Sequence, residues 1–231
     1  MHFETWEPVY EAVLDDFRYD RVGDSQARDV LHGLLAGRET LDPETVGADG
    51  AAVAVAGAGP SLESDLEAVR SADLVFAAST AADRLLERGV PVDCLVTDLD
   101  KHPETAVSLT ESGVPVAAHA HADNVQLVQK VVPETDPRAL VATTQSAPRP
   151  PVRNFGGFTD GDRAAFLADH LGAARLSFPG WDFDDPSVGP EKAQKLTWAE
   201  RLLYWLEQRR GERFAVLDGQ RDEIETESLP L

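Results

Sequence analysis

The stretch Ala52-Val-Ala-Val-Ala-Gly-Ala-Gly-Pro-Ser-Leu62 decides the fold. Its first five residues are small and apolar, as expected of a buried β-strand, and glycines follow directly at 57 and 59. A helical pattern runs from 63 to 69, beyond the glycine loop. Strand, loop and helix in this order are typical of a βαβ unit in a parallel sheet.

The same arrangement recurs along the chain. Apolar runs rich in Val and Ala occupy 52–56, 74–78, 94–96, 114–118, 139–142 and 175–178, with a weaker seventh run at 214–217. Helical patterns follow them, and continuous apolar strands are expected where helices cover both faces of a sheet. We therefore predict an α/β fold with a doubly wound, mostly parallel sheet of the Rossmann-like kind.

Residues 1–48 show a different pattern. Apolar side chains recur at helical spacing in two groups, one with Trp6, Tyr10 and Leu14 and the other with Leu31 and Leu35. This spacing is typical of amphipathic helices. We predict a small helical N-terminal appendage over 1–48, packed on an α/β catalytic domain that spans 49–231.

The charge of the chain limits its partners. There are 41 acidic and 21 basic residues, which give a formal net charge of −20. We expect no binding to nucleic acid, since affinity for the duplex comes largely from basic residues. A charge of this size repels itself at low ionic strength, so we expect the stability of the fold to rise with salt concentration.

The cysteine count and the apolar runs bear on location. Cys94 is the only cysteine, which excludes an internal disulfide and a cysteine-based metal site. The first residues lack the basic and apolar regions of a signal peptide, and no apolar run reaches the length of a membrane span. We expect a soluble, cytoplasmic protein with no membrane partner, and the sequence leaves open whether it forms a homo-oligomer.

Six of the predicted strands end in polar or glycine residues. In parallel sheets ligands bind outside the carboxyl ends of the strands, so these clusters are expected to meet at one edge. They lie at 57–62, 79–80, 97–100, 119–124, 143–146 and 180–182.

The most informative of these clusters contains Asp98 and Asp100. Two carboxylates at a strand end can hold Mg²⁺ while water and phosphate oxygens complete its coordination. In so acidic a chain, composition alone favours a solvated pair or a capping aspartate, but the position at a strand end favours a metal site. Nucleotide-sugar glycosyltransferases carry a similar pair, so the pair by itself does not identify the group transferred.

The fourth strand end carries His119, His121, Asp123 and Asn124. A transition-metal pair of histidines would need further ligands. We favour hydrogen bonding to phosphate or to a leaving group, with Asp123 as a third acidic metal ligand. The alternative is a pair of exposed loop histidines.

The other motifs each have a structural alternative. The loop of Gly57, Gly59, Pro60 and Ser61 could bind phosphate at a helix start or form only a tight turn. The run Asn154-Phe-Gly-Gly-Phe-Thr-Asp-Gly-Asp-Arg163 joins a glycine loop to a helix start, where Thr159 or Asp160 could simply cap the helix. Trp181 and Asp182 could bind a heterocycle or fill the core. Lys192 and Lys195 could contact phosphate or extend along the sheet edge.

Taken together, four of these motifs resemble the archaeal 6-hydroxymethyl-7,8-dihydropterin pyrophosphokinases. They are 57–62, 96–100, 119–124 and 154–164, and the likeness extends from about residue 50 to about residue 205. The family is distantly similar to thiamin pyrophosphokinase, and the acidic, lysine-poor composition would suit a halophilic archaeon. The chain departs from the family pattern at Lys101 and Ala122, where glycine is usual.

The resemblance implies Mg²⁺-dependent transfer of diphosphate from ATP to the hydroxymethyl oxygen of a reduced pterin, with release of AMP, for folate or methanopterin synthesis. It implies Mg²⁺ ligands at Asp98, Asp100 and Asp123, and an orienting role toward the reacting oxygens for His119, His121 and Asn124. The ATP-binding residues that it implies are Gly57, Gly59, Pro60, Ser61, Ser79, Thr80, Thr159, Asp160, Asp162, Arg163 and Lys192. The implied pterin-binding residues are Thr144, Gln145, Asn154, Phe155, Gly156, Gly157, Trp181 and Asp182.

Three other functions compete with this one. A nucleotide-sugar glycosyltransferase would also use the acidic pair, but the chain is short and lacks a second nucleotide-binding domain. A thiamin pyrophosphokinase-like enzyme would use the same metal site with another acceptor. A noncatalytic nucleotide sensor would not need to keep all three aspartates.

Overall fold

A single parallel sheet organises the structure, a computed structural model that describes all residues from Met1 to Leu231. The strand order is β5-β4-β3-β2-β1-β6, and every neighbouring pair is parallel. The strands are β1 (Ala52–Ala56), β2 (Leu74–Ala78), β3 (Cys94–Thr97), β4 (Val116–Ala120), β5 (Leu140–Thr144) and β6 (Arg175–Ser177). The predicted α/β fold with a parallel sheet is confirmed.

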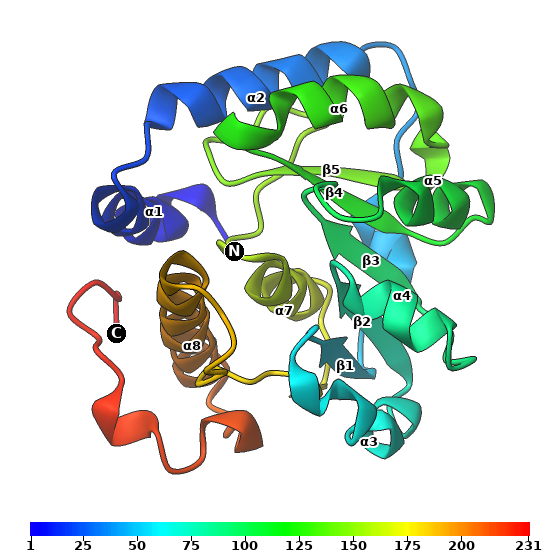
Figure 1. Cartoon of the computed structure of the whole chain (residues 1–231). Helices are drawn as coiled ribbons and strands as arrows, with labels where there is room; N and C mark the ends of the chain where they lie inside the picture. Colours follow the sequence, from blue (N-terminus) through cyan, green and yellow to red (C-terminus); the bar gives the residue numbers. More distant parts are fainter.

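Eight α-helices surround this sheet (Figure 1). They are α1 (Phe3–Phe17), α2 (Arg21–Leu34), α3 (Leu66–Arg70), α4 (Ala81–Leu86), α5 (Pro103–Glu111), α6 (Val125–Val131), α7 (Asp160–His170) and α8 (Pro190–Arg210). None of them is long and apolar enough to cross a membrane.

Two hydrophobic cores lie on opposite faces of the sheet. Successive side chains of a strand point to opposite faces. In β3, accordingly, Cys94 and Val96 belong to the core formed with α1, α7 and α8, whereas Leu95 belongs to the core formed with α2 to α6. Both faces of the strands are therefore buried, which explains why their sequences are apolar without alternation.

The strand order reverses at β1. Strands β2 to β5 are added one after another on one side of β1, whereas β6 pairs with its other side. The chain returns from β5 through α7, which contacts β1, β2 and β3 on the face that it shares with α8 (Figure 1). The loops after β1 and β6 thus leave toward opposite faces, and such a reversal is where open α/β sheets bind ligands.

The two predicted N-terminal helices are present and contribute to both cores. Trp6 of α1 packs against Phe166 of α7 and Trp205 of α8, with ring centroids 6.4 Å apart in each pair. On the other face, α2 lies beside α6 and contacts β4 and β5 (Figure 1). A domain boundary near residue 48 stays a prediction.

Some local predictions differ from the structure. The weak seventh strand at 214–217 is wrong, because Ala215–Leu217 is a short 3₁₀ helix whose Leu217 fills the core. A short apolar run does not by itself distinguish a strand from another buried segment. The fourth and fifth strands end two residues later than predicted, so His119 and Thr144 lie inside β4 and β5.

Candidate active site

A pocket of about 750 Å³ opens at the carboxyl ends of the strands. Residues that follow all six strands line it, which confirms that the polar strand ends meet at one edge. The predicted site residues that line the pocket are Gly57, Gly59, Ser79, Asp98, Asp100, His121, Asp123, Gln145, Thr159, Asp160, Arg163, Trp181, Asp182 and Lys192.

The turn after β3 directs two carboxylates into this pocket. Leu99, between them, is fully buried in the core and has the left-handed backbone conformation, with φ of 68°. Its N–H donates to Thr97 Oγ1 over 2.9 Å, and the Asp100 N–H donates to Asp98 Oδ1 over 3.2 Å. Because the Leu99 side chain is anchored in the core, Asp98 and Asp100 remain on the side of the turn that faces the pocket. A left-handed residue other than glycine carries strain that is common at functional sites.

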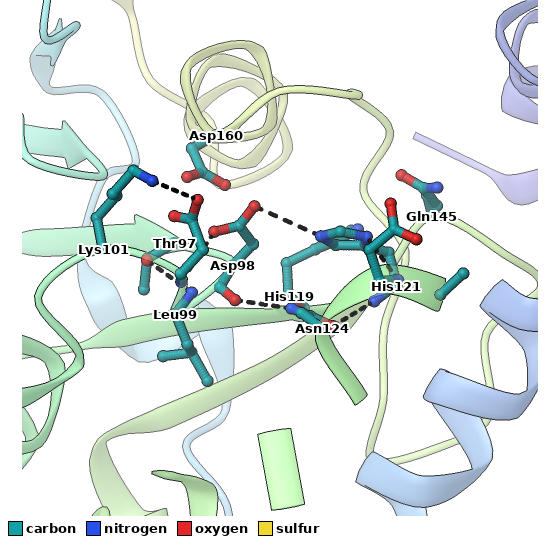
Figure 2. A network of polar contacts seen from close by, with 12 residues as sticks. Thr97, Asp98, Leu99, Lys101, His119, His121, Asn124, Gln145 and Asp160 are labelled. Carbon is teal, nitrogen blue, oxygen red and sulfur yellow. Dashed lines mark hydrogen bonds and ion pairs between the residues drawn. The ribbon is translucent and has the colours of Figure 1, made fainter. Parts of the chain in front are cut away.

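The turn after β4 holds a histidine against Asp98. His121 Nε2 lies 3.4 Å from Asp98 Oδ2, and His121 Nδ1 accepts the N–H of Asp123 (Figure 2). Asn124 fixes both strand ends, because its amide donates to the carbonyls of Asp98 and His119. Its own carbonyl accepts the N–H of His121. His121 therefore orients Asp98, and Asn124 shapes the turn rather than facing the pocket.

A third carboxylate comes from the start of α7. Figure 2 shows Asp160 lying across from Asp98. Burial and the charge of Asp98 raise the pKa of Asp160 to about 7, although Arg163 partly offsets this. Burial and Asp98 also raise the pKa of Asp100. Burial acts in the same direction on Asp98, but the hydrogen bonds from His121 and Asp100 outweigh it and leave the pKa of Asp98 well below its ordinary value. The three carboxylates thus concentrate negative charge at one place.

Cations gather around the same pocket. Lys101, Lys192 and Lys195 line it, and they are three of the four lysines in the chain. Lys101 Nζ lies 3.2 Å from Asp100 Oδ2, so this lysine neutralises part of the acidic cluster. Arg18 also lines the pocket, from the end of α1. In a protein with a charge of −20, this clustering is typical of a site for a polyanion.

The acidic cluster fits a magnesium ion that is bound only in part by protein. No group of three or more His, Cys, Asp or Glu side chains is arranged to hold a metal ion alone. Asp98 and Asp100 are oxygen donors on one turn, and Mg²⁺ usually takes one or two carboxylates together with water and substrate phosphates. Asp123 lines the pocket but is exposed. Its predicted role as a third ligand stays a prediction.

The loops after β1 and β6 bind one another. Gly57 N–H donates to the carbonyl of Pro179 over 2.9 Å, and Gly59 N–H donates to that of Gly180 over 2.8 Å. A Cβ atom on Gly59 would lie 2.7 Å from the carbonyl oxygen of Gly180, closer than real contacts allow. Glycine is therefore required here for the contact between the two loops.

The carboxylate of Asp182 closes this junction. Asp182 Oδ2 accepts both the N–H and the hydroxyl of Ser61, each over 2.9 Å. The indole of Trp181 donates to the carbonyl of Val55 over 2.8 Å. We call this contact between the Gly57–Ser61 loop and the Gly180–Asp182 loop the β1–β6 junction.

Other predicted site residues lie behind the pocket wall. His119 is 2% exposed, and its Nδ1 lies 3.0 Å from Thr143 Oγ1. Asn154 and Asp162 bind backbone groups of the loop before α7, and Asp162 closes a capping box with Thr159. The predicted residues that do not line the pocket are Pro60, Ser61, Thr80, His119, Asn124, Thr144, Asn154, Phe155, Gly156, Gly157 and Asp162.

Sequence patterns pointed to no site residue in the N-terminal helices, yet five residues of this region line the pocket. They are Arg18, Tyr19, Asp20, Gly23 and Asp24, from the turn between α1 and α2 and from the start of α2. One signal was present. Asp24 shares the buried face of α2 with Ala27 and Leu31, and an acidic residue in an apolar stripe is unusual.

The chain is similar in sequence to a known protein family. Residues 39–187 match the model of a family described as 6-hydroxymethylpterin diphosphokinase MptE-like. Proteins named 6-hydroxymethyl-7,8-dihydropterin pyrophosphokinase are similar along nearly their whole length. The one from Methanothermobacter thermautotrophicus is 37% identical over 90% of this chain and 96% of its own. Those from Pyrococcus furiosus and Methanocaldococcus jannaschii are 35% and 29% identical, each over 89% of this chain and over 94% and 96% of their own.

Proposed function

The chain belongs to the MptE-like family of 6-hydroxymethylpterin diphosphokinases, and we propose that it is a 6-hydroxymethyl-7,8-dihydropterin pyrophosphokinase that uses ATP and Mg²⁺. One observation carries the proposal: a single pocket combines the cluster of Asp98, Asp100 and Asp160 with the lysines of an otherwise lysine-poor chain. Such a pocket could bind a triphosphate through a metal ion held by the carboxylates and through the positively charged lysine side chains.

In the proposed reaction the hydroxymethyl oxygen of the pterin attacks the β-phosphorus of ATP. The bond between that phosphorus and the oxygen bridging to the α-phosphorus breaks, AMP leaves with that oxygen, and the hydroxyl proton is lost. Phosphoryl transfer of this kind needs positioning and charge neutralisation more than covalent help from the protein. The pocket residues described above supply both.

We assign the metal to Asp98 and Asp100. When bound, Mg²⁺ would neutralise phosphate charge and hold the polyphosphate in a defined conformation. His121 keeps Asp98 oriented and ionised, because it donates a hydrogen bond to the carboxylate. Asp160 lies across from Asp98 and would contact the ion through water.

Arg163, Lys101 and Lys192 are assigned to the phosphates. Arg163 is 7% exposed and pairs with Asp160 over 3.0 Å, so its guanidinium is fixed at the edge of the acidic cluster. Lys192 lies in the first turn of α8 and forms no ion pair, which leaves its charge available to a ligand.

Two separate aromatic groups support a reaction between two ring-containing substrates. Tyr19 and Phe158 line the pocket with ring centroids 6.5 Å apart, and Trp181 and Phe183 line it with centroids 5.8 Å apart. Aromatic faces of this kind stack on heterocycles. Adenine and the pterin would each take one group, with the polyphosphate between them.

The test is to identify the products. Protein, MgCl₂, ATP and the reduced pterin are incubated in molar KCl, and nucleotides and pterins are separated by chromatography with mass detection. The proposal predicts AMP and the pterin diphosphate in equal amounts, and no product when thiamin replaces the pterin. Formation of ADP with a pterin monophosphate, or the absence of AMP while ATP binds, would contradict the proposal.

A further inference from the structure

Asp24 is a buried carboxylate whose hydrogen bonds lead toward the acidic cluster. It is 2% exposed. Its Oδ2 accepts the hydroxyl of Tyr10 and the amide of Gln145, each over 2.7 Å, and its Oδ1 accepts the N–H of Ala122 over 2.9 Å. A buried charge is costly unless it is fully hydrogen-bonded, so these three donors are what allow the Asp24 carboxylate to be buried.

The bond to Ala122 places the turn that carries His121. Ala122 begins the 3₁₀ turn Ala122–Asn124, which directly follows His121. Gly23 allows the approach, since a Cβ atom there would lie 2.7 Å from the Cβ of Ala122. The α2 helix therefore docks on this turn through Gly23 and Asp24, and fixes the histidine that contacts Asp98.

The bond to Gln145 reaches the other side of the cluster. A carboxylate only accepts hydrogen bonds and a guanidinium only donates them. Gln145 lies between the two: its Nε2 donates to Asp24, and its Oε1 accepts from Arg163 Nη2 over 3.1 Å. Arg163 Nη1 in turn donates to Asp160 Oδ1 over 3.0 Å. A continuous series of hydrogen bonds thus joins Asp24 to Asp160 through Gln145 and Arg163.

We infer that Asp24 is a positioning residue for the proposed reaction, holding His121 against Asp98 on one side and, through Gln145 and Arg163, Asp160 on the other. The inference rests on the proposed function for its effect on turnover. It also means that the N-terminal helices are part of the active site, because the acidic cluster is held in place from α2.

The test uses a reciprocal exchange between Asp24 and Gln145. In Asp24→Asn, the NH2 group of the new side chain must face either the Ala122 N–H or the Gln145 NH2 group, so two donors face each other. In Gln145→Glu, a carboxylate meets the Asp24 carboxylate. In the double variant, the NH2 group introduced at position 24 donates to the new carboxylate at position 145, which still accepts from Arg163. The hydroxyl of Tyr10 can turn so that its oxygen accepts from the same NH2 group. Asp29→Asn is the control, since Asp29 lies on the same helix but is exposed and pairs with Arg149.

Each variant is measured in three ways. Release of AMP gives kcat and KM, calorimetry with Mg²⁺ and α,β-methylene-ATP gives the affinity for a donor that cannot react, and thermal denaturation gives the unfolding midpoint. We expect Asp24→Asn to lower kcat roughly 10-fold to 100-fold, as a small misplacement of reacting groups does. The double variant should recover most of this loss and most of the lost midpoint, while Asp29→Asn behaves as the wild type.

Two results would overturn the inference: turnover in Asp24→Asn equal to that of the wild type, or a double variant as slow as the product of the two single losses. A merely structural role would lower the midpoint of Asp24→Asn without loss of kcat in the folded fraction. If the wild-type protein released no AMP at all, the proposed function would fail by itself. The unfolding midpoints would still test the hydrogen-bond network. If the two single losses of midpoint simply added in the double variant, the proposed network would be contradicted.

Discussion

The turn after β3 and the β1–β6 junction are both polar strand ends with aspartates, yet they use these aspartates differently. In the turn, Asp100 has a raised pKa and Asp160, whose pKa is also raised, faces the same space from α7, so carboxylates repel one another there. In the junction, Asp182 is satisfied by two hydrogen bonds from Ser61. A strand-end position therefore does not by itself mark a ligand-binding residue, whereas a cluster of mutually unfavourable charges does.

The largest expected effect is on activity, and it concerns the turn. Asp98→Asn together with Asp100→Asn should lower AMP release about 100-fold to 1000-fold, as the removal of groups that stabilise transition-state charge does. The thermal midpoint should change little, because the relief of repulsion at Asp100 and Asp160 offsets the hydrogen bonds that Asp98 loses. Steady-state kinetics and thermal denaturation of the same preparation check both parts.

The matched substitution in the junction is Asp182→Ala, and it should lower stability more than activity. Loss of the acceptor leaves the Ser61 N–H without its partner, which costs about 1–3 kcal/mol of unfolding free energy. Activity per folded molecule should fall less than in the turn variant. An Asp182→Ala protein as stable as the wild type but inactive would reverse the comparison and assign Asp182 to substrate, as the sequence first suggested.

A smaller effect on stability separates two glycines. Gly59→Ala should destabilise the fold, because the new methyl group would collide with the Gly180 carbonyl across the junction. Gly33→Ala is the control: nothing lies within 4 Å of a Cβ there, and the residue is inside α2. That change should stabilise the protein by about 0.5–1 kcal/mol. Urea denaturation of both variants checks the difference, and equal effects would show that the junction tolerates a larger residue.

The structure also explains which parts of the site the sequence could predict. The strands at 52–56 and 74–78 match residue for residue because their apolar runs end at glycine or at Ser79. The end of β4 was missed, because His119 is polar and only its pairing with Thr143 across the sheet makes its burial acceptable. The position of Asp98 and Asp100 at the pocket was predictable, because both directly follow a strand and the carboxyl ends of parallel strands meet at one edge.

The role of the N-terminal helices could not be found in this way. Asp24 lies far in sequence from the strand ends that form most of the pocket, and its partners Gln145 and Ala122 come from two different strand ends. Pairings of this kind depend on tertiary contacts that local patterns do not contain. The one local sign is an acidic residue on the apolar face of a helix. It indicates a buried carboxylate but does not show which residue is its partner.

The smallest expected effect is the pH dependence that comes from His119. Burial and the charge of Arg163 lower the pKa of His119 well below its ordinary value, which is near 6.5 in an unfolded chain. Below pH 6.5 the unfolded chain therefore binds a proton that the folded protein does not, so stability is lost as the pH falls. Between pH 7.5 and 5.5 the wild type should lose about 1 kcal/mol more unfolding free energy than His119→Gln. Urea denaturation at both pH values measures this, and equal losses would show that His119 is not a buried neutral residue.

We propose that the turn after β3 binds the metal–nucleotide complex, whereas the β1–β6 junction stabilises the fold. The most direct measurement is the dissociation constant of Mn²⁺, used in place of Mg²⁺ and followed by electron paramagnetic resonance with saturating α,β-methylene-ATP. Asp98→Asn with Asp100→Asn should weaken Mn²⁺ binding at least about tenfold, roughly 1.4 kcal/mol, while Asp182→Ala should leave it unchanged. Equal affinity in all three proteins, or a loss confined to Asp182→Ala, would contradict the proposal.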